Sequence, residues 1–316
     1  MNNIMNLLKC EYRKLVDLKR LVVIGSLTIL LISLYSLLFS SEPISEWKES
    51  AGEIRVLQKD AIEALGQQSD DLEQNETVNT QIIRTIETEI DLIDYSIKND
   101  IPYRPSNVWF FMTKLEMLTL FIIFTSLLLG SRVLAVEDEN NTWINIIKSC
   151  NNRSSIIAAK VISAIITVVT YFLLFYIIGF IIGLIRFGIN GNDFVTVRWV
   201  DGSFEMENMI VSFIKTIGLG MTKAIFYTVL ISALNIVIGK NKICVFIGIC
   251  LVVFNEYISA FLANYKLNSI FPFKYLAYNV DHLNTIQELV PFLLVLGSYA
   301  LGFILIATYL FKKKSF

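Results

Sequence analysis

The chain alternates between long apolar stretches and polar connections. A bilayer's hydrocarbon core is about 30 Å thick and takes roughly 20 apolar residues of helix to cross. Six stretches have this character: 21–40, 107–135, 156–185, 209–238, 243–263 and 289–311. Gly218 and Gly220 lie inside the fourth stretch, and the sequence leaves its continuity open. The pattern predicts an all-α integral membrane protein with about six transmembrane helices.

Residues 1–20, which precede the first span, are amphipathic. Their apolar side chains recur at roughly helical spacing, with basic residues between them: Ile4, Leu7, Leu8, Leu15 and Leu18. Such a helix suits the surface of an anionic inner leaflet. We expect a cytoplasmic interfacial helix here; the alternative is a basic flank that only sets the topology.

Residues 41–106 form the one long polar insertion, with fifteen Asp and Glu against six Lys and Arg. Isoleucines at 83, 86, 90, 93 and 97 alternate steps of three and four, as in a coiled-coil seam. Upstream, Ile54, Leu57, Ala61 and Leu65 follow a similar pattern. The segment is expected to form an extracellular hairpin of two antiparallel helices, 44–66 and 75–99. A mobile acidic loop with partial helicity is the alternative.

The orientation follows from the basic residues near the spans, which gather on the cytoplasmic side. One set of connections, including the loop 136–155 and the tail 312–316, carries fourteen Lys and Arg, whereas the short loops of the other set carry four. Both termini are therefore expected in the cytoplasm of a cell membrane. Residues 186–208 and 264–288 are then extracellular, the second as a loop or a re-entrant segment.

The composition supports the membrane class: 54% of the residues are hydrophobic and 17% are charged. No phosphate-binding loop occurs, since Gly239-Lys240 is followed by Asn241 and residue 234 is leucine. The chain has a single histidine, His282, and an acidic outer segment that argues against nucleic acid as a partner. We expect no catalytic residue, cofactor or metal site in this chain.

The most informative stretch is the cytoplasmic connection 137–160. It opens with three carboxylates, continues with a short apolar turn that needs a protein groove or the bilayer to cover it, and ends in two basic residues. Its candidate functional residues are Glu137, Glu139, Thr142, Trp143, Ile146, Arg153 and Lys160.

This stretch resembles the corresponding loop in permease subunits of ABC exporters, in the type-2 permease superfamily. That loop has an acidic residue, Gly-Thr, a short hydrophobic helix, Pro, Arg and finally Lys. Here Glu137, Thr142, Arg153 and Lys160 stand at matching spacings. The positions that depart are Asn141, Cys150 and Ala159, where the family has glycine, proline and glycine.

The resemblance implies that 137–160 is the coupling segment for a separate ABC ATPase. Two ATPase copies would bind the ATP and Mg²⁺, and a second permease chain, identical or related, would complete the transporter. The residue usage is typical of a low-GC bacterium.

Charged residues inside the predicted spans are functional candidates by default. Glu116, Lys223 and Glu256 are the candidates for a translocation path, with Lys114 and Lys215 nearby in the outer halves. Snorkelling to the interface is the alternative explanation for each of them.

The leading hypothesis is an exporter permease for a peptide, an antimicrobial or another amphipathic compound, serving efflux or self-immunity. The acidic hairpin suggests cationic antimicrobial peptides as the substrate. One alternative is a non-transporting membrane sensor or scaffold that uses the hairpin. Another is a membrane enzyme, which the scarcity of histidine and of clustered carboxylates in the spans disfavours.

Overall fold

The computed structural model describes most of the chain. The residues it describes are 2–15, 18–39, 46–69, 76–140, 142–143, 146, 153–189, 194–200, 203–267, 269–279 and 286–313. The chain divides into two compact units. The first contains Met1–Leu31, Leu115–Ile178 and Lys215–Phe316, and the second contains Ile32–Lys114 and Gly179–Ile214. The long helices contribute to both units.

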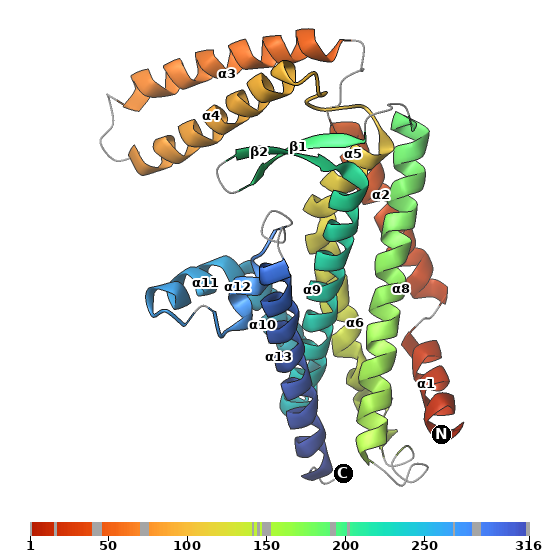
Figure 1. Ribbon diagram of the computed structural model, residues 1–316. Coiled ribbons are helices and arrows are strands. Elements are labelled where there is room, and N and C mark those ends of the chain that lie inside the picture. The colour runs from red at the N-terminus through yellow and green to blue at the C-terminus, as the bar shows by residue number, and fades with distance from the viewer. Residues whose placement is uncertain are drawn as a thin grey trace. The chain divides into compact units, whose positions relative to one another are not determined.

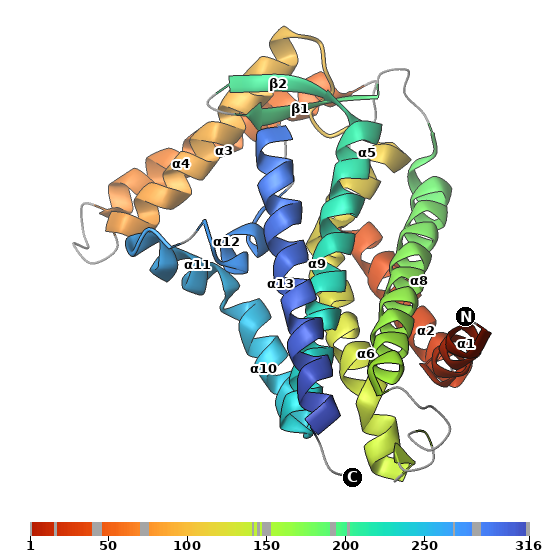
Figure 2. The same cartoon turned by 60° about the horizontal axis from the view of Figure 1, so that its bottom comes forward.

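The first unit is a bundle of apolar helices (Figures 1 and 2). Its elements are α1 (Asn2–Leu15), the start of α2 (Leu18–Leu38), η1 (Leu115–Leu118), α6 (Thr119–Asn140), most of α8 (Arg153–Phe187), most of α9 (Met209–Ile238), α10 (Asn241–Val253), α11 (Asn255–Asn264), α12 (Pro272–Leu276) and α13 (Ile286–Lys313). Leu127 of α6, Ile231 of α9, Cys244 of α10 and Phe292 of α13 share one buried core, so these four helices pack together.

Four described helices are long and apolar enough to cross a bilayer. They are Val108–Arg132, Arg153–Phe187, Met209–Ile238 and Glu288–Lys313, and the pair α10–α11 would make a fifth if it is one span. The first predicted span corresponds to a shorter apolar helix, Val22–Leu38. The helix α9 runs without a break through Gly218 and Gly220, which answers the question that the sequence left open. The count of six spans stays a prediction.

Two of the predicted spans are not single straight helices. The second is α5 (Val108–Lys114) followed by the 3₁₀ turn η1 and then α6. The fifth bends by 62° between α10 and α11. The side chain of Asn255, with its amide oriented to donate to Phe273 O (3.3 Å) and to accept from Ala277 N (3.0 Å), ties this bend to α12. A break at membrane depth needs such internal partners, because lipid offers none.

The second unit carries the predicted helical hairpin, formed by α3 (Trp47–Ser69) and α4 (Glu76–Lys98). Arg55 Nε lies 2.9 Å from Asp94 Oδ1, and Gln58 donates to Glu89 at 2.7 Å. From Arg55 to Gln58 the residue number on α3 rises, while that of the partner on α4 falls from Asp94 to Glu89, so the two helices are antiparallel. Beyond α4, the Tyr103 hydroxyl donates to Glu89. Burial, and secondly this hydrogen bond to the carboxylate, raise the pKa of Tyr103.

The isoleucine seam of α4 faces the partner helix, as expected, with Ile90 and Ile93 buried. The seam expected on α3 is partly wrong, because Leu57 is 68% exposed and Ala61 is also exposed. Trp47, Ala51 and Ile54 pack against α4 instead. The face of α3 that contacts α4 therefore also includes the polar residues Arg55 and Gln58, and Leu57 points away from α4.

This arrangement predicts opposite outcomes for two equivalent truncations. Ile93→Ala removes a fully buried side chain and should destabilise the hairpin by ~2–5 kcal/mol. Leu57→Ala, the matched control, should change it by less than ~0.5 kcal/mol. Limited proteolysis of the full chain in nanodiscs would report hairpin opening, and equal cleavage rates of the two variants would contradict the packing.

A two-stranded sheet also belongs to the second unit and was not predicted. In it, β1 (Val195–Val200) pairs antiparallel with β2 (Ser203–Asn208), with Val195 opposite Asn208. Phe204 of β2 lies 5.5 Å from Tyr95 of α4, measured between ring centroids. The expected loop 186–208 therefore contains a β-hairpin that contacts the helical hairpin.

Candidate functional site

Four charged side chains form a closed ring between α1, the end of α6 and the start of α8. Lys14 Nζ lies 3.0 Å from Glu11 Oε1 and 3.0 Å from Glu137 Oε1, while Lys160 Nζ lies 2.8 Å from Glu11 Oε2 and 2.8 Å from Glu137 Oε2. Each carboxylate thus contacts both lysines. The side chains of Lys160 and Glu137 are each 1% exposed, and that of Glu11 is 5% exposed. The ring joins α1 to both ends of the loop 137–160, more than 120 positions away in the sequence.

Local structure explains how α1 supplies two members. Glu11 and Lys14 are three residues apart in a helix and therefore lie on one face. Burial disfavours the charge on Lys14, but its hydrogen bonds to Glu137 and Glu11 outweigh burial and raise its pKa. Lys14 therefore stays charged at neutral pH, and the ring sets two acidic side chains against two basic ones. Charges this deeply buried are tolerated only when they are paired.

Aromatic residues cover the ring from the loop side. Lys160 Nζ lies 5.5 Å from the ring centroid of Trp143, within cation–π range, and the Trp143 and Phe311 centroids are 5.2 Å apart. Ile146 packs against the same cluster. Arg153 donates to the Lys312 carbonyl oxygen at 3.3 Å. The described part of the loop therefore packs against α8 and the end of α13.

The structure brings together three of the seven residues predicted for coupling, namely Glu137, Trp143 and Lys160. Thr142 and Ile146 lie next to them, with the Thr142 amide donating to Glu137 O at 3.1 Å. Glu139 belongs to the last turn of α6, and its side chain lies outside the described residues. Sequence reasoning missed Glu11, because residues 1–20 were interpreted only through their apolar and basic positions.

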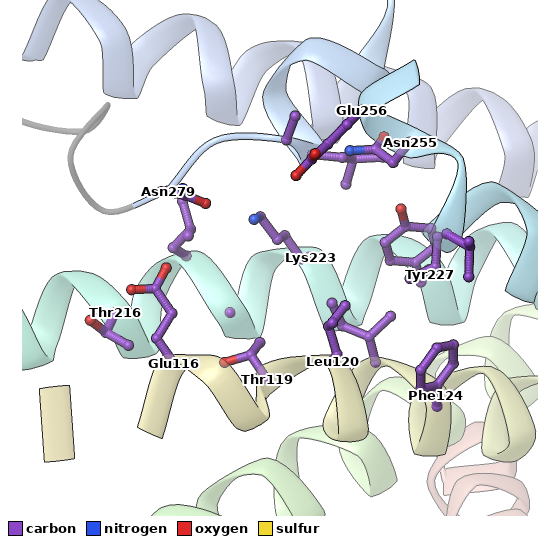
Figure 3. A pocket seen from close by; sticks show the side chains of 17 residues that line it. Glu116, Thr119, Leu120, Phe124, Thr216, Lys223, Tyr227, Asn255, Glu256 and Asn279 are labelled. Atoms are coloured by element: carbon purple, nitrogen blue, oxygen red, sulfur yellow. The ribbon is translucent and has the colours of Figure 1, made fainter. Parts of the chain in front are cut away.

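A second feature is a cavity of about 460 Å³ lined by η1, α6, α9, α10, α11 and α12 (Figure 3). It contains all three residues predicted for a translocation path, Glu116, Lys223 and Glu256. Figure 3 shows the Lys223 side chain projecting between Glu116, Asn279 and Glu256. The Lys223 ammonium donates to the Tyr278 carbonyl oxygen at 2.6 Å. Asn255 and Asn279 are polar lining residues that the sequence did not single out.

The other two intramembrane cations are not part of this lining. Lys114 ends α5 in the second unit, with its ammonium 5.3 Å from the Phe110 ring centroid. Lys215 lies near the start of α9, one residue before Thr216, which does line the cavity. Three of the five charged residues predicted inside the spans therefore line the cavity.

Comparison with known proteins places the chain in a family. Neither the curated proteins nor the solved structures contain a match to it. A family described as ABC-2 family transporter protein matches residues 5–316. Since this match covers nearly the whole chain, the protein belongs to the ABC-2 transporter family and is a permease subunit of an ABC transporter.

Proposed function

We propose that this permease belongs to an ATP-driven exporter of amphipathic compounds, and that a separate ATPase drives it through the 137–160 loop. The observation that carries the proposal is the buried ring of Glu11, Lys14, Glu137 and Lys160. The ring fastens both ends of the loop to α1. A force applied to the loop then moves α1, α6 and α8 together.

The burial of the ring defines the role of its members. With 1% exposure, Glu137 and Lys160 do not present their charges to a partner protein. They act as positioning residues that hold the two ends of the loop, at Glu137 and Lys160, against α1. The ATPase then contacts loop residues that are more accessible than Glu137 and Lys160. Thr142, which is half-buried, is one of them.

The assembly that follows has two ATPase subunits, which bind ATP and Mg²⁺, and two permease chains, identical or related. The permease lies in a bacterial cell membrane with both termini in the cytoplasm. The cavity around Lys223 supports an amphipathic substrate, because it offers both charged and apolar surface. Self-protection against an antimicrobial compound fits this chemistry.

The test is co-purification with a functional readout. The full chain, extracted from its native membrane in mild detergent, should bring vanadate-sensitive ATP hydrolysis into the eluate. Thr142→Ala should reduce that activity several-fold, whereas Thr222→Ala, a change on α9 outside the loop, should not. An eluate without ATP hydrolysis would overturn the exporter proposal.

One observation favours a second candidate function, a sensor or scaffold. The face of α3 that points away from α4 is exposed and carries Glu49, Glu53, Val56, Leu57 and Asp60. An acidic stripe around an apolar pair suits a cationic partner. Under this alternative, a hairpin deletion would abolish signalling while no ATPase co-purifies.

A further inference from the structure

The cavity around Lys223 is divided between polar and apolar surface. Figure 3 shows Glu116, Thr216 and Asn279 on one side of Lys223, and Leu120, Phe124 and Tyr227 on the other. Ile123, Leu219, Val252 and Leu276 add to the apolar lining. A volume of about 460 Å³ is in the range of sites for drug-sized ligands. A ligand that fills it needs an apolar body and one polar end.

The charges indicate the sign of that polar end. Two carboxylates, Glu116 and Glu256, line the cavity with one ammonium, and Lys223 interacts electrostatically with both. When all three groups are ionised, the part of the lining that the structure describes has one net negative charge. Charges within a membrane protein are costly unless they are compensated. Lys223 supplies part of that compensation from within the chain.

The position of Lys223 makes it an internal counter-ion. Its ammonium is held by the Tyr278 carbonyl oxygen, on the connection that follows α12, and it projects between the carboxylates. A cation entering the cavity offers the carboxylates a second partner and adds a positive charge that repels Lys223. Among the described lining residues, an anion would meet two carboxylates and a single ammonium, which already donates to the Tyr278 carbonyl oxygen.

We propose that this cavity binds lipophilic organic cations through Glu116 and Glu256, and that Lys223, which projects between these carboxylates, competes with the ligand for them. The inference rests on the proposed export function and names the class of its substrate. It yields a directional rule: removing either carboxylate weakens binding, whereas removing the lysine strengthens it. A cavity that only needed its charges for folding would not show this opposite response.

The test uses two probes of the same shape and opposite charge, tetraphenylphosphonium and tetraphenylborate. Binding is measured by equilibrium dialysis against the full chain in nanodiscs, with empty nanodiscs as the background. The wild-type chain should bind the phosphonium saturably and the borate no more than empty nanodiscs do. Glu256→Gln and Glu116→Gln should each weaken phosphonium binding ~10-fold or more, on the scale of one lost ion contact at intermediate dielectric.

Lys223→Met should tighten phosphonium binding several-fold. Glu288→Gln is the matched control, since this glutamate lies in α13 and does not line the cavity. Equal binding of the two ions, binding that survives both glutamine substitutions, or weaker binding after Lys223→Met would each overturn the inference.

The ATPase is absent from this measurement, which separates the two proposals. Co-purified ATP hydrolysis without phosphonium binding would refute the cation site alone. Phosphonium binding without an ATPase would refute the exporter and keep the site.

Discussion

Replacing Lys160 by methionine is expected to destabilise the folded protein by ~3–5 kcal/mol, the usual loss when one partner of a buried ion pair is removed. Glu11 and Glu137 would then share a buried site with Lys14 as their one remaining partner in the ring. Unfolding in mixed micelles at increasing denaturing-detergent fractions would measure the loss.

Two further variants distinguish the loss of the ion pair from a loss of stability that any substitution in this region would cause. Lys14→Met should cost less, about 1 kcal/mol, because the Lys14 side chain is 40% exposed and water screens its pairs. Adding Glu137→Gln to Lys160→Met removes one of the two stranded charges and should recover part of the stability. If the double variant is less stable than Lys160→Met alone, the ring is not an electrostatic unit.

Gly130→Val is expected to prevent normal packing of α6 against α9. A Cβ atom at Gly130 would lie 2.5 Å from Ile231 Cγ2 and 3.0 Å from the Thr228 carbonyl oxygen, so the two helices would have to separate. Overpacking of this kind costs ~1–3 kcal/mol or more. It would also strain the nearby hydrogen bond from Ser232 to the Gly130 carbonyl oxygen, which is 3.2 Å long. The yield of monodisperse protein after extraction should fall sharply.

Gly297→Val provides the matched control. This glycine also lies inside a predicted span, in α13, but nothing lies within 4 Å of a Cβ placed there. Both substitutions replace glycine by valine inside a helix and bring the same small gain in intrinsic helix propensity, so a difference between them reports the contact alone. Similar losses for the two variants would show that α6 and α9 do not approach closely at Gly130.

The sequence was a good guide wherever a local periodicity decides the structure. The apolar stretches are helices, and the isoleucine steps of three and four identify the face that α4 buries. Glu137 and Lys160 bound one short loop that contains Trp143, and the structure places these three residues together, while their coupling role stays a prediction. In each case the signal lies within a few turns of chain.

Features that depend on distant partners escaped prediction. Glu11 pairs with Lys160 across 149 positions, and no pattern around either residue reports the other. Leu57 fits an apolar seam by its spacing, yet it is exposed. Arg55 and Gln58 face α4 instead, because their side chains donate hydrogen bonds to Asp94 and Glu89.

Two further features differ in their local signal. The alternation in Val195-Thr-Val-Arg-Trp-Val is typical of a strand and could have been used to predict β1. The bend after α10 contains no proline or glycine, so no helix-breaking residue predicts it from the sequence.

That bend has a consequence for biogenesis. The polar side chain of Asn255 sits at the break and finds its partners on Phe273 and Ala277, about twenty residues later in synthesis. A nascent chain that has delivered only α10 and α11 to the lipid therefore holds an amide without these partners. Segment 241–277 is expected to enter the membrane as one unit, and truncation before Pro272 should leave α11 outside the bilayer.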